Sequence, residues 1–194
     1  MRVDADQKAT LAAPLPASDD LIRIREAQNG SLTAFEVLVE KHHARIYNFI
    51  WQFVRNQHDA EDLTQDTFVK AYRAISRFDS KYSFTTWLFT IARRSAINHY
   101  QRTMVTEELD SDLATGTNNP SDSAAAKDHA QSIWKVAERL LKPKQYEALW
   151  LTYGEGFSNA ETAQIMRSNP IYVKVLLHRG RELLKQKFIK SEVL

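Results

Sequence analysis

Apolar side chains recur at spacings of three, four and seven positions across residues 35–53, which places them along one face of a long α-helix. A similar pattern spans residues 59–76, and two further apolar stripes follow in residues 133–141 and 146–153. The 194 residues contain only five glycines and five prolines, fewer than the many turns of an all-β protein require. The sequence therefore predicts an all-α fold.

The composition changes in the middle of the chain, which predicts two small helical domains joined by a flexible acidic linker. Residues 104–130 contain six acidic residues and one basic residue, a net charge of −5 in a chain of formal charge +2, so the remainder carries +7. We predict an N-terminal flexible arm (1–17), a first domain (18–102), a linker (103–130) and a second domain (131–190). The charge asymmetry favours nucleic-acid-binding domains around an acidic linker, although an ordinary solvated linker explains it too.

Residues 158–187 have the pattern of a helix–turn–helix motif. Ser158 and Glu161 form a capping box at the start of a short helix, and Asn169-Pro170 starts a longer helix after a tight turn. Residues 159–190 contain seven basic and two acidic residues, a balance that suits binding to DNA phosphates with the second helix in the major groove. A helical hairpin with a solvated basic face would have the same pattern.

The segment at residues 77–102 combines six aromatic residues with five Arg and Lys and a single acid, Asp79. Aromatic rings stack on unpaired bases, and Arg and Lys hold a nucleic-acid backbone, so this composition indicates binding to single-stranded DNA. The alternative is that most of the rings belong to the core. We expect Trp87 and Phe89 to pack partly inward.

Four carboxylates lie in the first two turns of the helix that begins at residue 59. Asp62, Gln65 and Asp66 share one face through their three- and four-residue spacing. Carboxylates at a helix start also stabilise the helix dipole without any further role. The exposed face is therefore a candidate partner surface.

The composition argues against catalysis and against a membrane protein. The chain contains no cysteine, its six histidines lack metal-ligand spacing, and no phosphate-binding glycine loop or nucleophile elbow is present. The early apolar stretch is short and broken by Pro14 and Pro16, unlike a signal peptide. No window reaches the length of a membrane span, about 18 apolar residues. We expect a cytoplasmic protein without enzymatic activity, cofactor or metal.

Three strings resemble a known family. DAEDLTQDTFVKAYRAISRFD (59–79) and FTTWLFTIARRSAINHYQR (84–102) resemble the second conserved region of the extracytoplasmic-function sigma factors of bacterial RNA polymerase. LKPKQYEALWLTYGEGFSNAETAQIM (141–166) resembles the first half of their fourth region, and the resemblance covers residues 19–190. It implies an alternative sigma factor that binds core polymerase and directs promoter-specific initiation. It also implies an anti-sigma protein, often membrane-anchored, that inhibits the sigma factor until a stress signal ends the inhibition.

The resemblance assigns three surfaces. Asp62, Gln65 and Asp66 would dock on the clamp helices of the polymerase β′ subunit, and the chain would also contact the β subunit. The loop before residue 84 and the helix after it would read and hold the melted −10 strand of the promoter. The residues implied for that strand are Lys81, Tyr82, Phe84, Trp87, Arg93, Arg94, Asn98 and Arg102. The residues implied for the −35 duplex are Tyr172, Lys174, Val175 and Arg179.

Two stretches depart from the family pattern. Members usually carry Asn at the position of Arg94, and their recognition helix commonly has Gly-Thr-Val-Lys-Ser-Arg where residues 171–176 are Ile-Tyr-Val-Lys-Val-Leu. Val175 cannot hydrogen-bond a base edge, but it can touch a thymine methyl group. Helical spacing predicts that the core-facing residues of this helix are Val173, Leu177, Gly180 and Leu184, with Leu176 between the two faces.

A plain helix–turn–helix regulator with an N-terminal sensor or dimerisation domain is the alternative function. It explains residues 131–190 equally well. It leaves the acidic helix and the aromatic-basic segment without a role.

Overall fold

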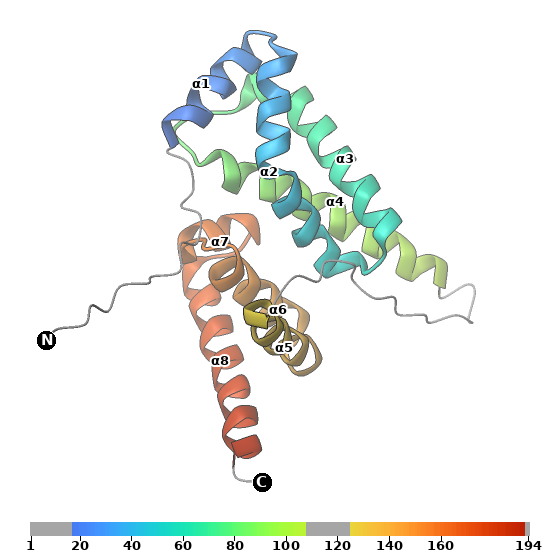
Figure 1. Ribbon diagram of the computed structural model, residues 1–194, viewed down its shortest axis with the longest axis vertical. Helices are drawn as coiled ribbons and strands as arrows, with labels where there is room; N and C mark the ends of the chain where they lie inside the picture. The colour runs from blue at the N-terminus through green and yellow to red at the C-terminus, as the bar shows by residue number, and fades with distance from the viewer. Residues whose placement is uncertain (1–16, 108–124, 193–194) are drawn as a thin grey trace, which may run out of the picture.

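The computed structural model describes residues 17–107 and 125–192, with side chains for residues 19–103 and 133–189. Nearly all of the predicted arm and the centre of the predicted linker lie outside the described residues. The described part is helical and contains no strand (Figure 1), which confirms the all-α prediction. None of its helices has the length and apolar character needed to cross a membrane. The elements are α1 (Ala17–Gln28), α2 (Leu32–Val54), α3 (Gln57–Ala74), a 3-10 turn (Ile75–Arg77), α4 (Phe84–Glu107), α5 (Ala125–Leu140), α6 (Pro143–Leu149), a π-turn (Trp150–Gly154), α7 (Asn159–Ile165) and α8 (Pro170–Glu192).

The helices begin and end at turn and cap residues. Gly30, with a φ of 95°, ends α1, and the Ser31 hydroxyl starts α2 by accepting a backbone N–H at 3.2 Å. Asn56 caps α3 in the same way. Helix α4 continues through residues 103–107 and α5 begins at residue 125, so both ends of the predicted linker are helical. Neither end contains the glycine or proline that would stop a helix.

The N-terminal unit consists of α1–α4, and α2 lies at its centre, packed against α1, α3 and α4. Its largest fully buried side chains are Ile24, Leu38, Ile46, Phe49, Ile50, Leu88 and Phe89. The rings of Phe49 and Phe89 have centroids 5.0 Å apart and join α2 to α4. The apolar periodicity of residues 35–53 thus produces the central helix of this unit.

The C-terminal unit consists of α5–α8, with α5, α6 and α7 packed on α8. Val173 and Leu177 are buried and Leu184 is half-buried, as predicted, and Leu176 also faces the core. A Cβ atom at Gly180 would lie only 2.6 Å from the Leu149 Cδ1 atom. A larger residue at position 180 would therefore require the buried Leu149 side chain or α8 to move.

One predicted apolar stripe is partly wrong. Ile133 and Leu140 were expected on the inner face of α5, but both are exposed. Trp134 packs inward instead, with its ring 4.8 Å from that of Trp150. Large aromatic rings bury more apolar area than the aliphatic side chains, which favours this rotation of the helix.

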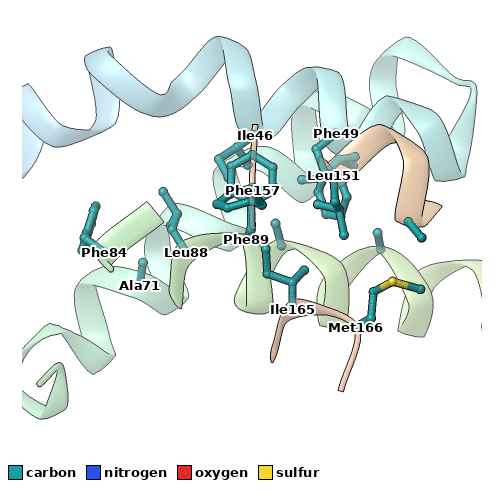
Figure 2. Packing of buried hydrophobic residues seen from close by; sticks show 14 of the residues in the cluster. Ile46, Phe49, Ala71, Phe84, Leu88, Phe89, Leu151, Phe157, Ile165 and Met166 are labelled. Atoms are coloured by element: carbon teal, nitrogen blue, oxygen red, sulfur yellow. The ribbon is translucent and has the colours of Figure 1, made fainter. Parts of the chain in front are cut away.

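The two units pack directly against each other, a contact that the sequence did not predict. Leu151 and Phe157 of the C-terminal unit lie among Ile46, Phe49 and Phe89 of the N-terminal unit (Figure 2). The centroids of Phe89 and Phe157 are 4.9 Å apart in an edge-on arrangement. The buried apolar side chains therefore form one continuous cluster across the seam between the units.

Candidate nucleic-acid and partner interfaces

The loop between α3 and α4 stands on a cluster of three aromatic rings. Phe78 and Phe84 are each 6% exposed, their centroids lie 5.5 Å apart, and both contact Trp87. Tyr82 is 60% exposed at the tip of the loop, beside the exposed Lys81. Phe84, which was expected to contact DNA directly, instead lies in the core because it fills the space beneath this loop. Tyr82 is thus the ring of the loop that is available for stacking.

A residue from α1 fixes the position of this loop. The Gln28 side-chain amide donates to the carbonyl oxygens of Ile75 at 3.0 Å and Phe78 at 2.9 Å. The Asp79 carboxylate accepts the Lys81 backbone N–H at 3.0 Å and tightens the turn further. Gln28 could not be predicted from the sequence, since a polar residue near a helix end gives no local indication of partners about 50 positions away.

The cations predicted on α4 lie on two different faces. Arg94, Asn98 and Arg102 are exposed and follow one another at four-residue spacing, so they form one row along the helix. Arg93 turns the other way and makes an ion pair with Glu147 of the C-terminal unit, with only 15% of its side chain exposed. Arg93 is therefore not at an open surface in this conformation, because a carboxylate occupies its guanidinium.

The acidic face of α3 is only partly available to a partner. Gln65 is exposed, and 64% of the Asp62 side chain is exposed beside His58. Asp66 is half-buried and bonds to Lys70, and it accepts the Ser95 hydroxyl of α4 at 3.2 Å. Asp66 thus helps to hold α3 against α4, which the sequence analysis did not predict.

The recognition helix of the helix–turn–helix motif presents a mixed surface. The Asn169 carboxamide caps α8 by accepting the Tyr172 N–H at 2.7 Å, as predicted. Tyr172 is 41% and Val175 is 37% exposed, and Lys174 and Arg179 are also exposed. Helical spacing places Arg179 beside Tyr172 and Val175, and Lys174 farther round the helix. Ile171 is the most exposed of the large apolar side chains described, at 76%, although it was not chosen from the sequence as a contact.

The polar chemistry of these surfaces suits binding rather than metal coordination. No cluster of three or more His, Cys, Asp or Glu residues that could hold a metal is found in the part of the chain that the structure describes. Exposed rings beside cations, and a capped basic helix, are features of nucleic-acid interfaces.

Two family models match the chain. Sigma-70 region 2 matches residues 38–104, and Sigma-70, region 4 matches residues 139–184. The RNA polymerase sigma factor CarQ of Myxococcus xanthus is 33% identical over 82% of this chain and 91% of its own length. The RNA polymerase sigma factor YlaC of Bacillus subtilis is 31% identical over 81% of this chain and 94% of its own length. The ECF RNA polymerase sigma factor SigW of the same organism is 29% identical over 84% and 94%.

Solved structures have the same arrangement of helices. CnrH in complex with the cytosolic domain of CnrY has a TM-score of 0.64 at 25% identity and covers 89% of this chain and 98% of that chain. The sigma factor RpoE in complex with the anti-sigma factor NepR from Bartonella quintana has a TM-score of 0.69 at 22% identity, over 80% and 96%, and supports the fold alone.

The role of Gln28 can be tested by replacing its amide with a carboxylate of the same shape. Gln28→Glu cannot donate to the two carbonyl oxygens and brings negative charge next to them. We expect a loss of about 1–3 kcal/mol of unfolding free energy, measured in urea, because the carbonyl groups lose their donor. Gln28→Met, which keeps the length of the side chain, serves as the uncharged comparison. Stability equal to that of the native protein in the Glu variant would contradict this role.

Proposed function

The chain belongs to the extracytoplasmic-function group of the sigma-70 family of RNA polymerase sigma factors, and from this premise we propose how its surfaces divide promoter recognition. Members of this family are initiation factors, not enzymes, and direct transcription by RNA polymerase. The proposal rests chiefly on one observation: the same chain carries two surfaces suited to nucleic acid. The N-terminal unit has the exposed Tyr82 ring beside Lys81, and the C-terminal unit has the capped basic helix α8. A plain regulator would leave the first of these surfaces without a role.

We assign the first unit, residues 18–102, to polymerase docking and the −10 element. Tyr82 stacks on or pockets an unpaired base, and Lys81 holds the adjacent backbone. Phe84 and Trp87 act from beneath by keeping the loop rigid. A rigid ring loses little conformational freedom on binding, which favours affinity. The exposed row on α4, with Arg94, Asn98 and Arg102, follows the strand.

We assign the second unit, residues 131–190, to the −35 element. Helix α8 enters the major groove, where Tyr172 and Val175 meet base edges. Lys174 and Arg179 provide the polar contacts, and the exposed Ile171 extends the apolar part of the surface. Such a helix favours a −35 sequence that exposes thymine methyl groups.

The protein partners follow from the same premise. Asp62 and Gln65 on α3 dock on the clamp helices of the β′ subunit, with Asp66 holding the helix in place, and the second unit contacts the β subunit. An anti-sigma protein restrains the chain. This part of the proposal is supported by the solved complexes of CnrH with the cytosolic domain of CnrY and of RpoE with the anti-sigma factor NepR. The protein acts in the cytoplasm beside the polymerase, and the anti-sigma protein reaches it there from a membrane anchor.

Reversing charge on the docking face should weaken binding to core polymerase. Asp62→Lys changes an exposed side chain with few contacts, so the helix should still form. We expect roughly fivefold weaker binding, because a contact at the rim of an interface contributes about 1 kcal/mol or less. Glu40→Lys makes the same charge change at an exposed position on α2 and should bind normally. Equal affinity of both variants for core polymerase would remove Asp62 from the interface.

Strand opening should depend on the ring at position 82. Stacking contributes about 1–3 kcal/mol per base, so Tyr82→Ala should reduce open-complex formation on duplex promoters by one order of magnitude or more. Tyr82→Phe keeps the ring and should retain most of the activity. Permanganate footprinting on the duplex template should show the melting defect, and pre-melted promoter DNA should partly rescue the Ala variant in runoff transcription. Equal defects on duplex and pre-melted templates would indicate a different role.

The recognition helix can be tested on a library of randomised −35 elements. Val175→Ser should change the preference at one position, by no more than the 1–3 kcal/mol or so of a single base contact. Lys174→Ala should weaken binding, and a loss that is uniform across sequences would identify Lys174 as a phosphate ligand. Unchanged selectivity in the Val175 variant would mean that the apolar face of α8 binds protein.

A further inference from the structure

The His42 side chain is buried where α1, α2 and the first residue of α4 meet, and neither of the proposed DNA-binding surfaces contains it. Only 3% of the residue is exposed. Its Nε2 atom lies 3.3 Å from the Asp20 Oδ2 atom of α1, and its Nδ1 atom is buried with no hydrogen-bond partner among the described residues. A buried polar atom without a partner is uncommon, because its loss of water is not compensated. A leucine would fill a similar space without this cost, so packing alone does not account for a histidine here.

The contact with Asp20 fixes the position of the proton on the imidazole ring. The Asp20 carboxylate also binds the Lys41 ammonium group at 2.6 Å, so it accepts hydrogen bonds and the His42 Nε2–H donates to it. The Nδ1 atom of the neutral ring then presents a lone pair. A second proton would create a buried charge and a buried N–H group with no acceptor, which is the more costly arrangement.

Burial outweighs the attraction of Asp20 and lowers the pKa of His42 from its ordinary value. The charged groups that act on the ring are Asp20 on α1, which favours protonation, and Lys41 and Arg45 on α2, which oppose it. The ring meets α4 at Phe84, which carries no charge. The His42 ring is therefore neutral near pH 7 and becomes protonated only at acidic pH.

The neutral His42 ring supports the aromatic cluster beneath the loop between α3 and α4. Its centroid lies 5.6 Å from that of Phe84, and the two rings are tilted by 56°. Phe84 in turn contacts Phe78 and Trp87, the two other rings on which the loop stands. A row of contacts thus leads from α1 through these rings to the loop.

Helix α1 holds this loop through residues near both of its ends. Near the C-terminus of α1, Gln28 donates to the carbonyl oxygens of Ile75 and Phe78. Asp20, in the first turn of α1 and about 12 Å away along the helix, binds His42. Figure 1 shows the loop passing beside α1 before α4 begins. A change at either end of α1 would therefore alter the position of the loop.

We propose that Asp20 and His42 are positioning residues for capture of the −10 strand. Asp20 holds the neutral His42 ring against Phe84, and this contact keeps Tyr82 in the orientation that binds an unpaired base. Neither Asp20 nor His42 touches the DNA. The proposal rests on the assignment of Tyr82 to the −10 strand. It adds a dependence on pH, because a charged imidazole ring is no longer stable in this buried position.

The first experiment measures binding of a single-stranded −10 oligonucleotide by core polymerase reconstituted with the full-length chain. Asp20→Ala should bind about tenfold more weakly than the native protein, a loss within the range that stacking on one base contributes. Asp19→Ala removes an exposed carboxylate from the same turn of α1 and should bind normally. Binding of a −35 duplex should be unchanged in both variants, which separates loop positioning from a general folding defect. Equal −10 affinity of the two variants would overturn the role of Asp20.

A second set of variants tests whether these residues act through the stacking ring. His42→Leu should be at least as stable as the native protein in urea, yet it should weaken −10 binding as much as Asp20→Ala does. The two changes together should weaken binding no more than one, since both break the same row of contacts. In a Tyr82→Ala background, either change should have little further effect, and a full additional loss there would overturn the positioning role. If Tyr82→Ala alone leaves −10 binding unchanged, the −10 assignment fails instead.

The dependence on pH provides a measurement that a purely structural role would not change. Because burial lowers the pKa of His42, the support from the neutral ring is complete above about pH 6.5 and is lost as the pH falls below that value. The native protein should therefore bind the −10 oligonucleotide about tenfold more tightly than His42→Leu at neutral pH, and this ratio should shrink toward one as the pH is lowered. Comparing the two proteins at each pH cancels the effect of groups that titrate elsewhere. A ratio that stays constant on acidification would overturn the requirement for a neutral ring.

Discussion

The ring of Phe89 joins the hydrophobic cores of the two units. It is fully buried, and its neighbours are Phe49 within its own unit and Phe157 across the seam. The Arg45 guanidinium lies over the rings of Phe89 and Phe157 and forms an ion pair with Glu155. Loss of the Phe89 ring would therefore affect three features at once. These are the packing of α4 on α2, the contact between the two units, and the ion pair of Arg45 with the buried Glu155 carboxylate. The orientation of α4 and of the loop before it depends on this contact.

The aromatic-basic segment divides its residues between support and contact. The enclosed rings of Phe78 and Phe84 and the half-buried Trp87 hold the loop from below, and Tyr82 projects from it. Gln28 ties the base of the loop to α1 by two hydrogen bonds. A surface built in this way is pre-organised, so little binding energy is spent on ordering it.

Local patterns in the sequence predicted the helices, their caps and the inner face of α8, because spacing and capping act over three or four residues. Ser158, Asn169 and Val173 lie as expected for this reason. The pairing of Arg93 with Glu147 could not be predicted, since the two residues are 54 positions apart and each has the composition of an ordinary surface charge. Phe84 was misplaced for a related reason: composition does not distinguish a ring that contacts DNA from one that supports it.

Gly180 has a consequence for how this sequence can vary. The Leu149 methyl group occupies the space that a side chain at position 180 would need, so α6 packs directly against the backbone of α8 there. A methyl group at position 180 would require either the buried Leu149 side chain or α8 itself to shift, unless position 149 became smaller. Substitutions at positions 149 and 180 are therefore expected to occur as compensating pairs, because a larger residue at one position needs a smaller residue at the other.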